Sequence, residues 1–179
     1  LDYPDAVALL LGDGGTIYPT ATQQAQEPPK PFELPPAHKD ARRVFAYLVK
    51  HRKIAPEVVS HFVRAGLLYE DAEHHNAVFV GTDEQGVPRH AHKRSTNSFG
   101  KTFRINVESG IPQYSFHHLG RDGALFVFEA PIDLMSYCTL HRRVKANAVA
   151  LCCLYDGPVN TYLRENPHLK QIDLCLDAD

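Results

Sequence analysis

Residues 124–133 read ALFVFEAPID, in which five apolar residues are followed by Glu129, Pro131 and Asp133. An apolar run without alternation is typical of a strand that is buried on both faces of a sheet. Pro131 suits the first turn of a helix, because the N–H that it lacks has no helical partner at that position. The stretch therefore predicts a buried strand that ends at an acid and leads directly into a helix.

The residues that follow continue this alternation of strands and helices. The expected elements are a helix over Pro131–Arg143, a strand over Ala148–Leu154, a helix over Pro158–Glu165 and a strand over Gln171–Leu176. Strands that alternate with helices in this way indicate a parallel α/β sheet. We expect residues 121–179 to form this α/β unit.

Upstream of residue 121 the pattern is different. Two short helices are predicted, over His38–Arg52 and from Pro56 to a stop at Gly66. Short β-rich runs follow over Ala77–Thr82, Val87–Arg94, Thr102–Val107 and Gln113–His118, with hairpin turn sequences between them. We therefore expect an α+β unit over residues 37–120, built from two helices and a small antiparallel sheet.

Composition excludes several classes of protein. The chain has 179 residues, 44% apolar and 22% charged, with a net charge of −2, which excludes global disorder and a wholly cationic nucleic-acid binder. No apolar run approaches the roughly 18–20 residues that cross a bilayer, so we expect a cytoplasmic protein with no membrane partner. Residues 1–36 are expected to hold a short helix, Tyr3–Gly12, and a Pro-rich linker.

Cysteine and histidine spacing argues against zinc. The four cysteines form no C-x-x-C pair, and we expect reduced thiols. The histidines gather in doublets such as His74-His75 and His117-His118. We expect these doublets to be solvated, and we expect no zinc site in this chain.

Acids follow each strand of the predicted parallel unit. Glu129 follows the first strand, Asp156 the second, and Asp177 and Asp179 the third. The carboxyl ends of parallel strands share one edge, and an Asp-x-Asp pair can place two oxygen donors on one octahedral cation. We predict a Mg²⁺ (or Mn²⁺) site built by Glu129, Asp177 and Asp179, suited to phosphoryl chemistry. The alternative is that these acids cap helix N-termini.

The two acidic segments together resemble the Toprim domain of bacterial primases, topoisomerases and some nucleases. Its signatures are similar to Leu125–Asp133, where an aspartate follows the glutamate by four residues, and to the Asp-x-Asp of Ile172–Asp179. The resemblance implies that Glu129 is a general acid/base or ligand and that Asp177 and Asp179 bind the metal, all three being catalytic. It also implies that Asp133 supports the metal site. The family continues beyond this motif, so we expect the chain to be truncated, with only the N-terminal half of a Toprim domain.

Upstream segments resemble the catalytic core of bacterial primases. Tyr47–Phe62 is similar to the helical start of that core, Asn76–Arg94 to its first hairpin, and Lys101–Asn106 to a second basic segment. The pattern resembles best the primase-like, Toprim-bearing proteins of plasmids and conjugative elements. The resemblance implies DNA-templated primer synthesis from nucleoside triphosphates, in replication or mobilisation of a mobile element, and it admits a helicase partner.

The densest positive run lies in and after the predicted hairpin. We predict that single-stranded DNA contacts Arg89, Lys93, Arg94, Lys101 and Arg104, while a solvated hairpin is the alternative. Strand alternation places His90, His92 and Arg94 on one face. Three functions stay open: a primase-type nucleotidyltransferase, a Toprim nuclease, and a catalytically inactive DNA-binding accessory domain.

Overall fold

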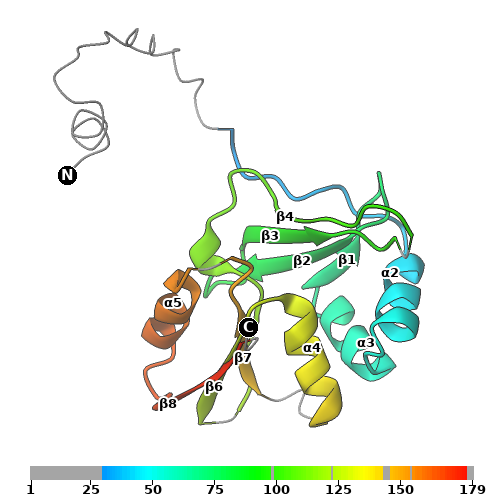
Figure 1. Ribbon diagram of the computed structural model, residues 1–179. Coiled ribbons are helices and arrows are strands. Elements are labelled where there is room, and N and C mark those ends of the chain that lie inside the picture. Colours follow the sequence, from blue (N-terminus) through cyan, green and yellow to red (C-terminus); the bar gives the residue numbers. More distant parts are fainter. Residues whose placement is uncertain (1–29, 98, 122, 143–145, 154, 177–179) are drawn as a thin grey trace, which may run out of the picture.

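The structure is a computed structural model that describes residues 30–97, 99–121, 123–142, 146–153 and 155–176 (Figure 1). The expected helix over Tyr3–Gly12, most of the Pro-rich linker, Asp177 and Asp179 lie outside these residues. Within the described ranges, none of the helices combines the length and the apolar character needed to cross a membrane.

Two short helical segments open the described fold, as expected. α2 (Arg42–Ala46) runs directly into a π-helical turn, η1 (Tyr47–His51), and α3 spans Pro56–Arg64. α3 begins at its proline and ends before Gly66, whose φ of 72° lies in the left-handed region that glycine adopts readily. The first helix starts later than residue 38, because the chain at His38 is still extended and donates its N–H to the carbonyl of Glu70 (2.7 Å).

The first sheet is antiparallel, with strand order β1-β2-β3-β4. Its strands are β1 (Leu68–Glu70), β2 (Ala77–Thr82), β3 (Pro88–Arg94) and β4 (Arg104–Asn106). The predicted runs Ala77–Thr82, Val87–Arg94 and Thr102–Val107 are confirmed as β2, β3 and β4, the last over three residues only, while β1 was not predicted. Its three residues are too few to show a period.

The two faces of this sheet have different neighbours. Phe79 and its register partner His92 point to what we call the inner face, where Phe79 joins the core with the helices. Val78 and Ala91 point to the outer face, where they pack with Phe32 of the extended segment 30–36. Part of the predicted linker therefore covers the sheet.

The second sheet has strand order β5-β7-β6-β8. Its elements are β5 (His117–His118), β6 (Ala124–Phe128), α4 (Pro131–Leu140), β7 (Asn147–Ala150), α5 (Gly157–Glu165) and β8 (Gln171–Cys175). β6 is parallel to both β7 and β8, which confirms the predicted α/β unit. β5 is antiparallel to β7, so the sheet is mixed rather than wholly parallel.

The prediction that residues 113–118 extend the first sheet was wrong. Pro112–Tyr114 forms a 3₁₀ turn, and the chain then crosses to β7, where the Ser115 hydroxyl donates to the Ala150 carbonyl. The crossing is close: a Cβ on Gly81 of β2 would lie 1.7 Å from the Tyr114 carbonyl oxygen. Beyond the crossing, Phe116 is fully buried between Phe62 and Phe79, and this burial favours the observed path over strand pairing in the first sheet.

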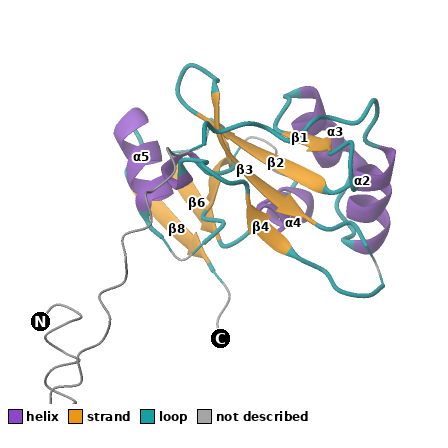
Figure 2. Cartoon of the chain, turned by 90° about the horizontal axis from the view of Figure 1, so that it is seen from above, coloured by secondary structure: helices purple, strands orange, loops and turns teal. Residues whose placement is uncertain are grey.

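A single apolar cluster joins the two sheets. Phe62 of α3, Phe79 of β2, Phe116, Phe126 of β6 and Met135 of α4 all belong to it. Figure 2 shows the result from above, with α2 and α3 at one end, α5 at the other, and the strands of both sheets between them. The common core fixes how the inner face of the first sheet stands against the end of β6.

Candidate functional site

Glu129 lies where the chain leaves the central strand of the second sheet. Its carbonyl accepts a hydrogen bond from the Cys152 N–H (2.9 Å), and the Phe128 carbonyl accepts one from Leu151 (2.9 Å). These bonds hold the end of β6 to the chain that follows β7, while the Glu129 side chain is half-buried. The predicted strand-end acid is therefore at the carboxyl edge of the sheet.

A pocket of about 340 Å³ opens beside Glu129 and is shared by both sheets. Its lining residues from the second sheet are Glu129, Ala130, Cys152 and Cys153, and those from the first sheet are His92, Arg104, Ile105 and Asn106. We call it the interface pocket. It brings a carboxylate from one sheet together with a guanidinium from the other.

His92 is the buried imidazole of the interface pocket. Its Nδ1 lies 2.8 Å from the Asn106 Oδ1 on the next strand, and since that oxygen can only accept, the ring donates from Nδ1. Burial lowers the pKa of His92, and the charges of Arg94 and Arg104 lower it further. The ring is therefore neutral at pH 7, and its Nε2 is left as an acceptor.

The other predicted metal ligands have different surroundings. Asp133 accepts a hydrogen bond from the Ala130 N–H (3.2 Å), so it caps the start of α4. Asp177 and Asp179 lie outside the described residues. The register pairs Phe128 with Cys175, so the chain leaves β8 at the same edge where Glu129 leaves β6.

The placement of Asp156 at the end of a strand was wrong. β7 ends at Ala150, and Asp156 directly precedes α5, where its carboxylate accepts a hydrogen bond from the Asn160 side chain (3.0 Å). The apolar run 148–154 is longer than the strand because the backbone turns at Cys152, whose φ is 58°.

The structure separates the predicted basic residues into two groups. Arg94 and Arg104 are direct register partners on the inner face, the side of the sheet that also carries His92.

Arg89, at the other end of β3, forms an ion pair with Asp83 (2.7 Å). Lys93 points to the outer face, with its Nζ 3.6 Å from the buried Asp71 carboxylate. Lys101 is exposed in the loop before β4, and Arg104 is exposed at the rim of the interface pocket.

A second pocket lies next to Arg94 and was not predicted. It measures about 370 Å³, and its lining includes Arg43, Tyr47, Lys50 and Phe99. Arg94 lies near both pockets, because its Nε donates to the Tyr47 hydroxyl of this one (3.1 Å) and its register partner Arg104 lines the interface pocket. Phe99 is 92% exposed. We call this feature the aromatic pocket; its signal in the sequence is an aromatic residue in a loop flanked by basic residues.

Part of this chain matches a protein family of unknown function. The family described as "Protein of unknown function (DUF3991)" matches residues 46–122, which include α3 and the whole first sheet. A plasmid-encoded relative, the "Uncharacterized protein pXO2-78" of Bacillus anthracis, is 31% identical over 116 residues. The match takes in 56% of this chain and 30% of the relative.

Solved structures identify the fold. The primase fragment of the bacteriophage T7 primase-helicase protein superimposes with a TM-score of 0.52 and 19% identity, over 73% of this chain and 53% of that one. The chain has a primase-like fold. The catalytic domain of DnaG primase bound to single-stranded DNA is similar at a TM-score of 0.48 and 12% identity, over 78% of this chain and 56% of that one. The chain thus spans about half the length of the T7 fragment.

Proposed function

We propose that this chain is the nucleic-acid-binding and catalytic core of a primase-type nucleotidyltransferase. The observation that carries the proposal is the interface pocket, where Arg104 of the first sheet and Glu129 of the second line one space. Template-directed joining of nucleotides needs cations for phosphates and carboxylates for divalent metals in the same place. The primase-like fold supports this use of the pocket.

The template strand is proposed to follow the inner face from one pocket to the other. Phe99 in the aromatic pocket offers a surface on which a base can stack, and Arg43 and Lys50 beside it offer charge for the backbone. Arg94 and Arg104 then lead the phosphates toward Glu129. Lys101 lies in the exposed loop between these positions. Arg89 and Lys93 are already paired with acids, so we leave them out of the proposed path.

The metal of this reaction is proposed to bind at the carboxyl edge of the second sheet. Glu129, Asp177 and Asp179 would hold Mg²⁺ or Mn²⁺ through oxygen donors, which these hard cations prefer. The bound ion supplies charge neutralisation and orientation for the attacking and leaving oxygens. Asp133 supports the site indirectly, because its carboxylate holds the backbone at Ala130 beside Glu129.

The wider setting of the reaction belongs to the same proposal. We infer nucleoside triphosphates as substrates, and a role in replication or mobilisation of a mobile element. We keep the division into residues 1–36, 37–120 and 121–179, the last being the N-terminal half of a Toprim domain. The name of the T7 relative joins a primase to a helicase, which supports a helicase as partner.

Product analysis tests the proposal. Because this chain spans 30% of the curated relative, the assay uses the longest natural protein that contains it, with this chain in parallel. Single-stranded DNA, labelled ribonucleotides and Mg²⁺ or Mn²⁺ are supplied, and products are separated by length. We expect labelled oligonucleotides longer than the input nucleotide, and we expect their loss in Glu129→Gln and in Asp177→Asn.

Two other results would replace the proposal with one of its alternatives. Shortened DNA with no incorporated label would identify a nuclease that uses the same carboxylates. Salt-sensitive binding of DNA with neither product, unaffected by Glu129→Gln, would identify an inactive DNA-binding accessory domain.

A further inference from the structure

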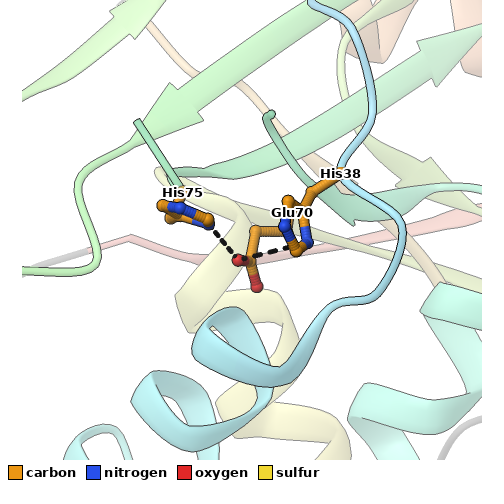
Figure 3. Close-up of side chains that lie close together, drawn as sticks. All are labelled: His38, Glu70 and His75. Carbon is orange, nitrogen blue, oxygen red and sulfur yellow. Dashed lines mark hydrogen bonds and ion pairs between the residues drawn. The ribbon is translucent and has the colours of Figure 1, made fainter. Parts of the chain in front are cut away.

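Two histidines and a glutamate gather at β1, the edge strand of the first sheet opposite β4. The Nδ1 atom of His75 lies 2.6 Å from the Glu70 Oε1, and the Nδ1 of His38 lies 3.8 Å from the same oxygen (Figure 3). The centroids of the two imidazole rings are 4.8 Å apart, and the rings meet edge to face. One potential ligand atom from each residue therefore falls within 4.8 Å of the other two.

Each of the three side chains is held by its own element. Glu70 ends β1 and is 2% exposed, and its Oε2 accepts the backbone N–H groups of Arg43 (2.9 Å) and Val44 (3.1 Å) at the start of α2. That leaves the Glu70 Oε1 facing the two imidazoles. His38 comes from the extended chain before α2, where its N–H is bonded to the Glu70 carbonyl.

His75 is positioned by the turn between β1 and β2. Asp71 organises this turn: its carboxylate accepts the His74 N–H (2.6 Å) and the Asn76 side-chain amide (2.8 Å). The Thr96 hydroxyl donates to the His75 carbonyl (2.9 Å). His75 itself has a φ of 57°, a conformation that few residues other than glycine and asparagine adopt. The surrounding bonds thus fix this ring toward Glu70.

We propose that His38, Glu70 and His75 form a binding site for zinc or a similar borderline divalent cation. Two imidazole nitrogens and one carboxylate oxygen are a zinc ligand set, and three protein ligands leave a fourth position for water. Ligand atoms around tetrahedral zinc lie about 3.3 Å apart, given metal–ligand distances of about 2.0–2.2 Å. The His75–Glu70 hydrogen bond is shorter than this, so the ion replaces its proton and the two atoms separate by less than about 1 Å.

The ligand set separates this site from the carboxylate edge of the second sheet. Imidazole nitrogen suits zinc, copper and nickel, whereas Mg²⁺ prefers oxygen donors. The site uses His75, a member of a doublet that the sequence spacing had led us to regard as solvated. Sequence reasoning missed it because its ligands come from three segments whose approach depends on the pairing of β1 with β2.

The position of the site suggests what the ion does. His38 follows the extended segment 30–36, which covers the outer face of the first sheet, and Glu70 touches the first turn of α2. An ion bound to all three residues connects that segment, β1 and the following turn. A cation that binds the folded chain and not the unfolded one stabilises the fold by an amount that grows with the logarithm of its concentration above Kd.

Calorimetric titration with Zn²⁺ in the presence of excess Mg²⁺ tests the proposal. We expect one ion per chain and a rise in melting temperature. His75→Asn is the main variant, because asparagine tolerates the positive φ and can still hydrogen-bond to Glu70. His74→Asn is the matched control, since His74 is the exposed neighbour in the same turn. We expect His75→Asn to weaken zinc binding at least about tenfold, and His74→Asn to leave it unchanged.

His38→Gln keeps the test decisive if His75→Asn does not fold, which circular dichroism without metal establishes beforehand. It removes a ligand outside the turn and should weaken binding by a similar factor. The absence of one-to-one binding, or equal zinc affinity in wild type and both variants, would overturn the proposal. So would thiolate charge-transfer bands on substitution with Co²⁺, because Cys152 and Cys153 of the interface pocket are the competing soft donors.

Discussion

Arg104 on β4 and Glu129 at the end of β6 line the same pocket, although they belong to different sheets. The shared apolar core determines this arrangement, because Phe79 of the first sheet and Phe126 of the second pack in one cluster. Under the proposed function, a polyphosphate with its cation would satisfy both charges: the guanidinium would bind phosphate oxygens, and the carboxylate would bind the cation that accompanies them.

DNA binding should depend on the inner-face arginines. Replacing Arg94 and Arg104 with Gln removes two phosphate contacts, and each contact contributes about 0.7 to the slope of log K against log salt for a single strand. We therefore expect the slope of the double variant to be shallower by about 1.4 in a fluorescence-anisotropy titration. Arg89→Gln is the control, since Arg89 is paired with Asp83 at the far end of β3.

If Arg89→Gln made the salt slope shallower and the double variant did not, the DNA interface would instead be the continuous basic run of the sequence. An Arg89→Gln slope as shallow as that of the double variant would show that the Asp83 pair opens to bind phosphate. Slopes equal to that of the wild type in all variants would show that the inner-face arginines are solvated and do not bind DNA.

Phe99 should contribute to binding without contributing to stability. Its side chain is 92% exposed, so Phe99→Ala removes almost no buried contact and should leave the melting temperature unchanged. Stacking of one base on an aromatic ring is worth about 1–3 kcal/mol, which corresponds to a loss of affinity between about fivefold and 150-fold. Leu140→Ala, at a residue that is 79% exposed on α4, is the control. Unchanged affinity in Phe99→Ala would exclude stacking at this position.

Acid should destabilise the fold through His90. This residue is 1% exposed, and neither ring nitrogen has a hydrogen-bond partner among the described residues. Burial lowers its pKa to about 4, so below about pH 6.5 the unfolded chain binds a proton that the folded chain does not. Stability is therefore fully present above about pH 6.5 and is lost as the pH falls toward 4, with a slope of up to about 1.4 kcal/mol per pH unit.

Urea unfolding between pH 7 and pH 4.5 measures this slope. Burial lowers the pKa of His92 and His117 in the same direction, so a smaller slope should remain after His90→Leu. Val80→Ala, which truncates another buried side chain of the first sheet, should lower stability equally at every pH. A wild-type slope in His90→Leu would contradict the prediction.

The sequence predicted where helices and strands lie better than it predicted which strands pair with one another. β2, β6 and α3 match the predicted ranges closely, because apolar periodicity and a proline at N1 are local signals. The path of residues 113–118 could not be predicted from local signals. It depends on the close approach of Gly81 to Tyr114 and on the burial of Phe116 between the sheets. Nothing in the spacing of the run records either contact.

The candidate site was predictable in part for the same reason. Glu129 could be found from its place after an apolar strand, and Arg94 from the alternation of the strand that carries His92. Which of the basic residues were free to bind depended on tertiary contacts, since Lys93 of β3 is engaged by Asp71, which follows β1 two strands away. The aromatic pocket also depends on how the loop that holds Phe99 meets α2 and η1.

Substitutions of Asp133 and Glu129, the two acids near the start of α4, should affect the free energy of unfolding differently. Asp133 caps the helix through the Ala130 N–H, so Asp133→Ala should lower the free energy of unfolding by about 1 kcal/mol. Glu129 is half-buried at the strand end, and in the proposed metal site it shares an ion with carboxylates that would repel one another without a cation. Glu129→Gln should therefore leave the melting temperature without metal unchanged or slightly higher, while it abolishes metal-dependent nucleotide transfer. A loss of stability in Glu129→Gln as large as that in Asp133→Ala, with transfer retained, would mean that both acids are helix caps. The metal edge would then lose its central residue, and the DNA-binding accessory domain would become the better account of the molecule.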